Sequence, residues 1–349
     1  MRAANDPEHL ENILKLMTGM PLNHKDLDLY KELSRIDLQE EEWLRAPMIV
    51  ATNMERFLYS DLRSVSYGIY SRTPVIRWPM KVKKGTIETM HSIHYEYFVA
   101  GCDAVISTNI KKELGLVNAL NIRMHSLIVD NPQDRHKLDL VAASIENSPN
   151  VLTREDVLVS IDQIPDFVIV EVTKESLEIL SREKQQHLKL LSISQNEVLI
   201  PIAPQNVGKT FPVYSSFTQD GPLFDVEVCP HFPINPTFAM TVNKAQGQTL
   251  DRIIVAISKR PGNTNFSYEA LNVALTRVKD SKNLRLFLIG NTALKRQDGI
   301  RYLFDLTPDP SIDFFFKSYI PSEVPWYEKT FLPSLCVRRL IENALPLIR

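Results

Sequence analysis

Residues 238–250 read FAMTVNKAQGQTL, and the fold assignment depends on this stretch. The apolar run FAMTV gives way at once to the polar segment NKAQGQT, and a second apolar run covers residues 253–257. This order predicts a strand, a functional loop and another strand. Lys244 supplies a point charge suited to a phosphate, and Gly247 allows the backbone to approach a ligand closely. We therefore expect the loop to carry function, because such loops do so when a rigid sheet holds them.

The segments on both sides of this stretch have the pattern of a parallel sheet. After the loop, the sequence predicts a helix from about Ser267, with that serine as its N-cap, and a strand at 284–290. Upstream, MIVATN at 48–53 predicts a buried parallel strand with a functional tip, followed by a helix over about 54–65. Strand, helix and strand joined by short links indicate βαβ units and therefore a parallel sheet.

Further elements are predicted upstream of the central stretch. Asp6 can cap a helix over residues 6–20, and a second helix is expected over residues 24–35. Two more strands are predicted at 74–82 and at 103–109. We expect both strands to belong to the same α/β scaffold.

From about Gly115 to Phe232 the pattern of the sequence changes. Short β-branched runs alternate with turn residues, in the order HSLIVD, VLVSID, FVIVEVT, EVLIPIA, FPVYSSF and FDVEV. This pattern predicts a small antiparallel β-module inserted in the α/β scaffold. Residues 176–191 are predicted to form a helix or a long charged excursion within the module.

Composition limits the class of protein. The chain has 349 residues, of which 44% are hydrophobic and 23% charged, enough for roughly two globular domains. The net charge of −2 gives no global basic character, so an anionic partner must meet a local patch. Three widely spaced cysteines without a CxxC pair indicate a reducing compartment rather than a disulfide framework. No apolar run is long enough to span a membrane, so no membrane partner is expected.

One spacing invites interpretation as a metal site. Glu88, His91 and His94 recur at three-residue intervals. No fourth ligand is near them in sequence, and the zinc-protease helix needs the pattern HExxH. We therefore expect no metal site built by this chain.

Two motifs together resemble a known family. The segments FPINPTFAMTVNKAQGQTL and YEALNVALTRVKDSKNLRLFLIG are similar, in order and near the usual spacing, to the C-terminal motifs of superfamily-one DNA helicases. The Pif/RecD-like group, which includes the helicases of helitron-type mobile elements, is the best match. Asn243 stands where many members have histidine.

The resemblance extends upstream, to cover roughly residues 8–292. HLENILKLMTGMPLNHKDLDLYKEL resembles the family's linker between its two motor domains, and MIVATNMERF resembles the first motif of the second motor domain. STNIKKELGLVNAL resembles the segment that enters the inserted β-domain. Here the family's usual Asn-Gly pair is replaced by Asn118 and Ala119.

The resemblance implies roles in ATP hydrolysis for particular residues. Arg277 corresponds to the arginine finger that stabilises charge on the γ-phosphate during its transfer, so it is the implied catalytic residue. On physics alone, an arginine near a helix end is instead an ordinary solvated partner of the helix dipole. The residues implied to lie near the nucleotide are Gln246, Gly247, Asn53 and Arg56.

The resemblance also implies single-stranded DNA as a partner. Contacts to the DNA backbone carry affinity without sequence preference, as a translocating enzyme needs. Processes of DNA repair and recombination, and an intracellular location that is nuclear in a eukaryote, follow as expectations. The residues implied to face the DNA are Thr241, Asn243, Lys244 and Thr249.

ATP and Mg²⁺ are expected as cofactors only together with a complementary first motor domain. That domain carries the phosphate loop GxxxxGK[ST] and an acidic magnesium ligand. Residues 203–210, APQNVGKT, are a relaxed match, but the β-branched and aromatic segment after them predicts no helix under the phosphates. We therefore expect a phosphate-loop-bearing domain or subunit as a partner, and negligible ATP hydrolysis by this chain alone.

The predicted fold class is α/β, a RecA-like parallel sheet with helices on both faces, interrupted by the antiparallel β-module. The function implied is ATP-dependent unwinding of DNA by translocation on a single strand. The alternative left open is a non-catalytic module that binds single-stranded DNA, or a mobile-element remnant. The predicted parts are a helical linker at 1–45, the motor domain's halves at 46–115 and 233–292, the β-module at 116–232 and a tail at 293–349.

Overall fold

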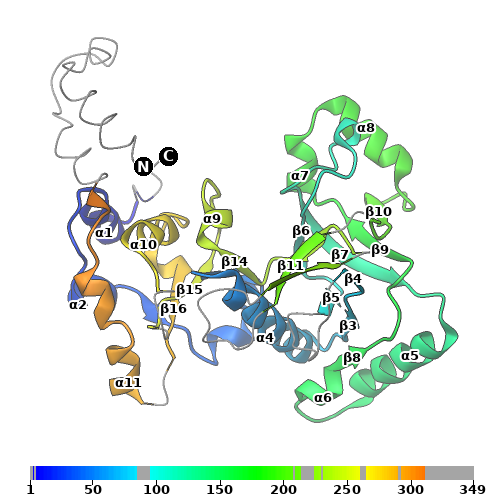
Figure 1. The fold of residues 1–349 in the computed structure, drawn as a ribbon, viewed down its shortest axis with the longest axis horizontal. Coiled ribbons are helices and arrows are strands. Elements are labelled where there is room, and N and C mark those ends of the chain that lie inside the picture. The colour runs from blue at the N-terminus through cyan, green and yellow to red at the C-terminus, as the bar shows by residue number, and fades with distance from the viewer. Residues whose placement is uncertain are drawn as a thin grey trace. The chain divides into compact units, whose positions relative to one another are not determined.

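The computed structural model describes residues 3, 5–84, 95–206, 209–213, 224–228, 231–259, 265–289 and 292–310 (Figure 1). The chain divides into two compact units, Met1–Thr307 and Pro308–Arg349. Residues 311–349 of the predicted tail lie outside the described residues.

A five-stranded sheet, in which every neighbouring pair of strands is parallel, forms one half of this unit. Its strand order is β1, β16, β15, β2, β14, so its edge strands come from the beginning and the middle of the chain. The bounds are Lys31–Glu32 for β1, Met48–Val50 for β2, Ala239–Thr241 for β14, Ile253–Ala256 for β15 and Leu284–Phe287 for β16.

Both faces of the parallel sheet are buried, because successive residues of a strand point to opposite faces. In β15, Val255 packs in a cluster with residues of α1 and α10, while Ile254 packs in another cluster with Trp43 of α3 and Tyr59 of α4. The helices concerned are α1 at Pro7–Met17, α3 at Glu41–Arg45, α4 at Asn53–Ser71 and α10 at Tyr268–Leu275. The predicted layering, with helices on both faces of a parallel sheet, is confirmed.

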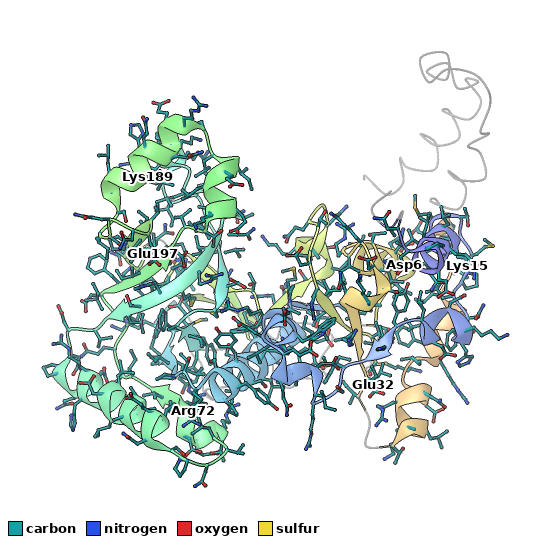
Figure 2. All side chains as sticks on the ribbon, turned by 180° about the vertical axis from the view of Figure 1, so that it is seen from behind. Asp6, Lys15, Glu32, Arg72, Lys189 and Glu197 are labelled. Carbon is teal, nitrogen blue, oxygen red and sulfur yellow. The ribbon has the colours of Figure 1, made fainter. Side chains whose placement is uncertain are left out.

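The first helix is tied to a distant part of the chain. Asp6 caps α1, as predicted, by accepting a hydrogen bond from the main-chain nitrogen of His9 at 3.0 Å. The same carboxylate accepts bonds from the main-chain nitrogen and the hydroxyl of Ser281, at 2.8 and 2.7 Å. Lys15, also on α1 and labelled in Figure 2, forms an ion pair with Asp26 at 2.7 Å. These contacts fix α1 beside the parallel sheet.

Between β2 and β14 the described residues form three further sheets, in which antiparallel pairing predominates. Their strand orders are β10-β9-β7-β6-β13, β11-β12-β4 and β5-β3-β8, with β3 and β8 parallel. The bounds are β3 Val75–Pro79, β4 Val82–Lys84, β5 Tyr95–Val99, β6 Asp103–Ile106, β7 Asn121–Ile128, β8 Leu158–Ser160, β9 Phe167–Glu171, β10 Leu199–Ile202, β11 Lys209–Val213, β12 Phe224–Val228 and β13 Ile234–Pro236. The six strands predicted between residues 115 and 232 are all present.

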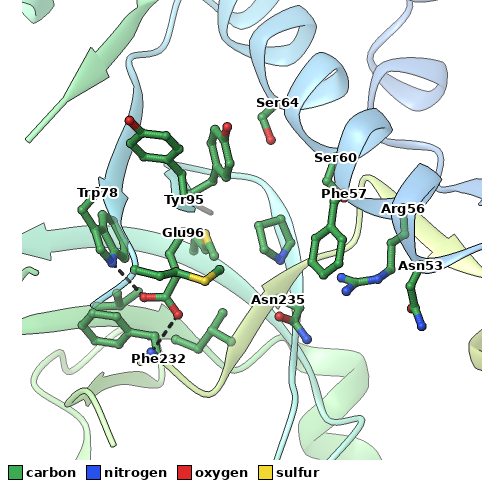
Figure 3. A pocket seen from close by; sticks show the side chains of 16 residues that line it. Asn53, Arg56, Phe57, Ser60, Ser64, Trp78, Tyr95, Glu96, Phe232 and Asn235 are labelled. Carbon is green, nitrogen blue, oxygen red and sulfur yellow. Dashed lines mark hydrogen bonds between the residues drawn. The ribbon is translucent and has the colours of Figure 1, made fainter. Parts of the chain in front are cut away.

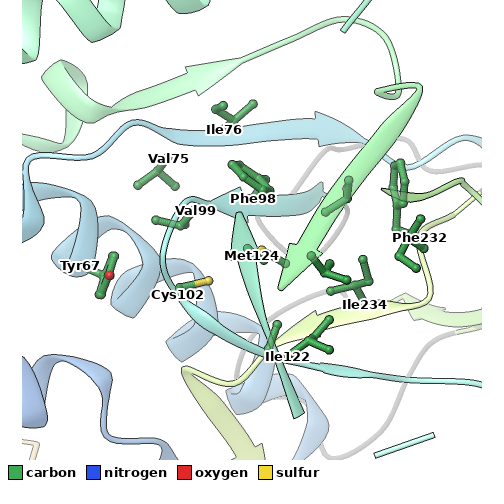
Figure 4. Packing of buried hydrophobic residues seen from close by; sticks show 14 of the residues in the cluster. Tyr67, Val75, Ile76, Phe98, Val99, Cys102, Ile122, Met124, Phe232 and Ile234 are labelled. Carbon is green, nitrogen blue, oxygen red and sulfur yellow. The ribbon is translucent and has the colours of Figure 1, made fainter. Parts of the chain in front are cut away.

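The sheets β10-β9-β7-β6-β13 and β5-β3-β8 share one hydrophobic core (Figure 4). Strands β3 and β5 contribute Val75 and Phe98, and β7 contributes Ile122 and Met124. Cys102 lies in this core with no exposed surface, and burial raises the pKa of its thiol, which leaves it unsuited to act as a nucleophile. The helices of this part are α5 at Pro132–Asn147, α6 at Arg154–Val157, α7 at Lys174–Ile179 and α8 at Arg182–Leu191.

Several predicted elements differ from those observed. The helix expected over 24–35 ends at Asp28, and residues 31–32 form edge strand β1 instead. Strands predicted at 74–82 and 103–109 exist, but they pair in the antiparallel sheets rather than in the parallel one. Helix α5 was not predicted. The other short helices are α2 at His24–Asp28, α9 at Val242–Ala245 and α11 at Ala293–Asp298, with 3₁₀ turns at Asp37–Gln39, Lys112–Leu114, Ser281–Asn283 and Arg301–Asp305.

Within the described ranges, none of the helices combines the length and the apolar character that crossing a membrane requires.

Candidate functional site

The central segment leaves the parallel sheet at the end of β14. The predicted loop begins with one helical turn, α9, and Gly247 follows with a φ of +85°. A side-chain carbon added at Gly247 would meet nothing within 4 Å, so its left-handed backbone, and not close packing, is the reason for glycine here. Gln246 and Gly247 are exposed.

Arg277 joins this segment to the end of α10. Its side chain is buried, with a relative exposure of 7%. Nη1 donates to the main-chain oxygens of Ala245 at 3.1 Å and Gln248 at 3.0 Å, and Nε donates to that of Val273 at 2.8 Å. In return, the main-chain nitrogen of Leu250 donates to the oxygen of Arg277 at 2.9 Å. The two motifs quoted from the sequence therefore form one hydrogen-bonded unit.

A cavity of about 350 Å³, here called the loop pocket, lies beside this unit. Gln246 and Arg277 line it, so the structure brings together two of the residues expected at the nucleotide. Apolar side chains of α1 form the opposite wall, among them Ile13 and Met17. Asn272 and Thr276 also line the pocket, and the Thr276 hydroxyl accepts a bond of 2.7 Å from Arg277 Nη2.

The described residues that line the loop pocket offer no carboxylate to a magnesium ion. Mg²⁺ is held by carboxylates together with phosphate oxygens, and no Asp or Glu is among the described residues that line this pocket. The relaxed phosphate-loop match also lacks the necessary geometry. Its Lys209 begins strand β11, where a phosphate loop requires the start of a helix.

Asn53 and Arg56, also expected near the nucleotide, lie elsewhere. They occupy the first turns of α4, which is fixed by a capping box between Thr52 and Glu55. Both line a separate cavity of about 250 Å³, here called the aromatic pocket, between α4 and strands β3 and β5 (Figure 3). Of the residues expected at the nucleotide, Gln246 thus lines one cavity and Asn53 and Arg56 line another.

The residues expected to face DNA are also divided. Asn243 and Lys244 are exposed on α9, and Thr241 is half-buried at its start. Thr249 lines a cleft of about 730 Å³ that also includes residues of the β-module. Three arginines and four carboxylates line this cleft, namely Arg45, Arg123, Arg252, Glu42, Asp103, Glu175 and Asp251. The carboxylates outnumber the arginines, so the exposed position of Lys244 is the better place for a phosphate.

Another buried network lies behind α10. His9 is fully buried, and its Nδ1 lies 3.0 Å from the hydroxyl of Tyr30. Burial lowers the pKa of His9, and the neighbouring Asp6 opposes this change only in part. Tyr268, at the start of α10, donates its hydroxyl to the main-chain oxygen of Leu16 at 2.6 Å. The position of α10, the helix that leads to Arg277, therefore depends on α1.

The expectation of no metal site can be compared with only part of the chain. Glu88, His91 and His94 lie outside the described residues. Among the residues that are described, no group of three or more His, Cys, Asp or Glu side chains is placed to hold a metal ion.

Some lining residues were missed by the sequence reasoning. Asn272 and Thr276 precede Arg277 at helical spacing, so their shared face could have been read from the motif helix. The walls of the aromatic pocket could not, because Trp78 and Glu96 meet only through the pairing of β3 with β5. Pairing between distant strands leaves no local signal in the sequence.

The fold and the site define an α/β protein with a motif-bearing loop at the end of a parallel strand, held by an arginine from the next helix. No protein-family model and no curated protein matches the chain. Among solved structures, it is similar to the Pif1 helicase from Candida albicans, with 13% identity, a TM-score of 0.48, and coverage of 91% of this chain and 59% of that one.

Two structures of a bacterial protein are similar as well. Bacteroides Pif1 bound to ssDNA has 14% identity and a TM-score of 0.49, over 91% of this chain and 55% of that chain. Pif1 from Bacteroides sp in complex with ADP-AlF4 has 13% identity and a TM-score of 0.39, over 90% and 54%. The chain therefore spans little more than half the length of these proteins.

Proposed function

We propose that this chain is the second motor domain, with its inserted β-module, of a Pif/RecD-like DNA helicase. The observation that carries the proposal is the contact of Arg277 with the main-chain oxygens of Ala245 and Gln248. It joins the two motifs by which the sequence resembles that family. The activity of the complete enzyme is ATP-driven translocation on single-stranded DNA.

In this proposal the loop pocket is one half of an ATP site. Arg277 and Gln246 line it, and the arginine supplies positive charge for the phosphoryl group in flight. ATP with Mg²⁺ supplies the free energy when it is bound between this pocket and a phosphate-loop-bearing domain. Such a domain belongs either to the same protein or to a partner subunit.

The DNA side of the proposal rests on α9. Asn243 and Lys244 are exposed on this turn, which connects directly to the carbonyls that Arg277 holds. A change at the nucleotide that moves Arg277 therefore reaches the DNA-facing residues through a single loop. That arrangement couples the two sites.

ATP hydrolysis by the purified chain, with and without single-stranded DNA, tests the nucleotide half of this proposal. We expect negligible turnover in both cases, because Lys209 is on a strand and no carboxylate for Mg²⁺ lines the loop pocket. DNA-stimulated turnover that Lys209→Ala abolishes would show that the chain carries its own phosphate site.

Binding of a labelled single-stranded oligonucleotide tests the DNA half. We expect binding to weaken with salt, and Lys244→Ala to weaken it further and reduce the salt slope by about one. Lys259→Ala, at another exposed lysine, serves as the matched control. Equal effects of both substitutions would remove the role given to Lys244.

A further inference from the structure

The aromatic pocket is not explained by ATP binding. Its walls are Phe57 of α4, Trp78 of β3 and Tyr95 of β5, with Phe232 from the segment before β13 (Figure 3). At about 250 Å³ its volume is below the roughly 300–1,000 Å³ typical of pockets for drug-sized ligands. It therefore suits one planar ring system rather than a whole nucleotide.

Charge is distributed unevenly in this pocket. Glu96 lies inside, where Oε2 accepts a bond from Trp78 Nε1 at 2.8 Å and Oε1 accepts one from the main-chain nitrogen of Phe232 at 3.0 Å. Arg56 lies on the other side, with its guanidinium 4.1 Å from the centre of the Phe57 ring. A carboxylate inside repels a phosphate, whereas a neutral ring with N–H groups can donate to it. The guanidinium of Arg56 is placed to meet a phosphate outside the pocket.

A buried hydroxyl points to a ligand as well. Ser64 has no exposed surface, it lines the pocket, and its Oγ has no hydrogen-bond partner among the residues that the structure describes. Figure 3 shows its side chain directed from α4 toward the strands. A buried polar group without a partner destabilises the folded chain. A bound ring with a polar edge would satisfy it.

Contacts of one lining residue, Tyr97, and of the neighbouring Asp61 hold the pocket open. Asp61 of α4, which is 4% exposed, accepts a bond of 2.7 Å from the Tyr97 hydroxyl and forms an ion pair of 3.1 Å with Arg154. These bonds fix α4 against β5 and α6. The cavity is therefore formed before a ligand arrives, and little ordering is needed on binding.

We propose that the aromatic pocket binds one unpaired nucleobase of single-stranded DNA, stacked on Phe57 with its polar edge toward Glu96 and Ser64. Arg56 and Asn53 then contact the strand's backbone at the rim, rather than ATP. Stacking on aromatic side chains accepts any base, as translocation along a strand requires. This inference rests on the proposed function, because the proposed function supplies single-stranded DNA as the ligand.

The test compares two labelled strands of about 12 nucleotides, a length within the usual range for single-strand binders. One is oligothymidine, and the other has the same backbone with every base removed. Ser64→Leu fills the pocket from its buried side, and Ser66→Leu, on the same helix but outside the pocket, is the matched control. Affinities are measured by fluorescence anisotropy.

We expect the full-length chain to bind oligothymidine more tightly than the abasic strand. Ser64→Leu should weaken binding of oligothymidine about 5-fold or more, as for the loss of one base stack, and leave the abasic strand unaffected. Ser66→Leu should change neither. If Ser64→Leu does not fold, as judged by circular dichroism, Phe57→Ala takes its place with the same expected result.

Failure of this inference is distinguishable from failure of the proposed function. Equal binding of both strands, or equal weakening of both by Ser64→Leu, overturns the base pocket and leaves backbone binding intact. If neither DNA strand binds, both the base-binding role of the aromatic pocket and the proposed DNA-binding function are overturned. Calorimetry with thymidine alone distinguishes a strand from a free nucleoside, because saturation at micromolar thymidine would identify a nucleoside site and overturn the assignment to DNA.

Discussion

The guanidinium of Arg277 lies against the end of α9, with Nη1 3.1 Å from the main-chain oxygen of Ala245. The residue implied to act on phosphate is therefore also part of the loop's own structure. A loss of activity in an Arg277 variant has two possible causes, and stability has to be measured beside activity. The first prediction follows from this double role.

Arg277→Ala is expected to lower the free energy of unfolding by about 2–3 kcal/mol, because it leaves buried carbonyl oxygens without their charged donor. Urea denaturation followed by circular dichroism measures the change. Lys279→Ala, at an exposed neighbouring position, should stay within about 0.5 kcal/mol of the original chain. An Arg277→Ala variant as stable as this control would mean that the hydrogen bonds to the loop contribute nothing net.

Ala119→Gly should stabilise the protein. Ala119 has a φ of +69°, a backbone conformation that costs a residue with a side chain roughly 1–2 kcal/mol. Glycine removes this strain but loses about 0.5–1 kcal/mol through greater freedom of the unfolded chain, so the net gain is about 0.5–1 kcal/mol. Thermal and urea unfolding give the value. Ala143→Gly, at an exposed position within α5, should instead destabilise the protein by about 1 kcal/mol.

Stability should depend on pH through His9. Burial lowers the pKa of this histidine in the folded state below its ordinary value of 6.5. Between the two values the unfolded chain binds more protons, so stability is fully present above about 6.5 and is lost as the pH falls below it. Urea denaturation at a series of pH values measures the slope. His9→Gln should flatten it in that range, and an unchanged slope would assign the proton uptake to other groups.

Asp61→Asn should loosen α4 from the β-module. The substitution removes the charge that Arg154 pairs with and weakens the bond from the Tyr97 hydroxyl. We expect a loss of about 1–3 kcal/mol, because the carboxylate is buried. Asp139→Asn, at an exposed position of α5, controls for the change of charge. Equal melting temperatures for the two variants would contradict the role given to Asp61.

Local patterns in the sequence predicted where strands lie well, but they predicted poorly which strands pair with one another. The strand β15 was predicted because Ile253 to Ala256 are apolar on both faces, a property of each strand by itself. The strand β3 was predicted too, but its assignment to the parallel sheet was wrong, since pairing with β5 and β8 depends on residues far along the chain. Helix α5 was missed although Asn131 and Pro132 are a recognisable start for a helix.

The candidate site was also predictable only in part, for residues that the two motifs bring together. Arg277 and Gln246 were expected to act together, and both line the loop pocket. Asn53 was expected near them and is not, because α4 faces the aromatic pocket. A motif shows which residues a chemistry needs, whereas only the packing of distant strands shows which cavity they reach.

The helix α4 takes part in two hydrophobic cores. Tyr59 packs with Trp43 over the parallel sheet, while Val65 and Tyr67 pack within the core of the antiparallel sheets. Its 19 residues make a rod about 28 Å long, and such a helix bends far less readily than a loop. A tilt of one core is therefore transmitted to the other through α4, which also forms one wall of the aromatic pocket.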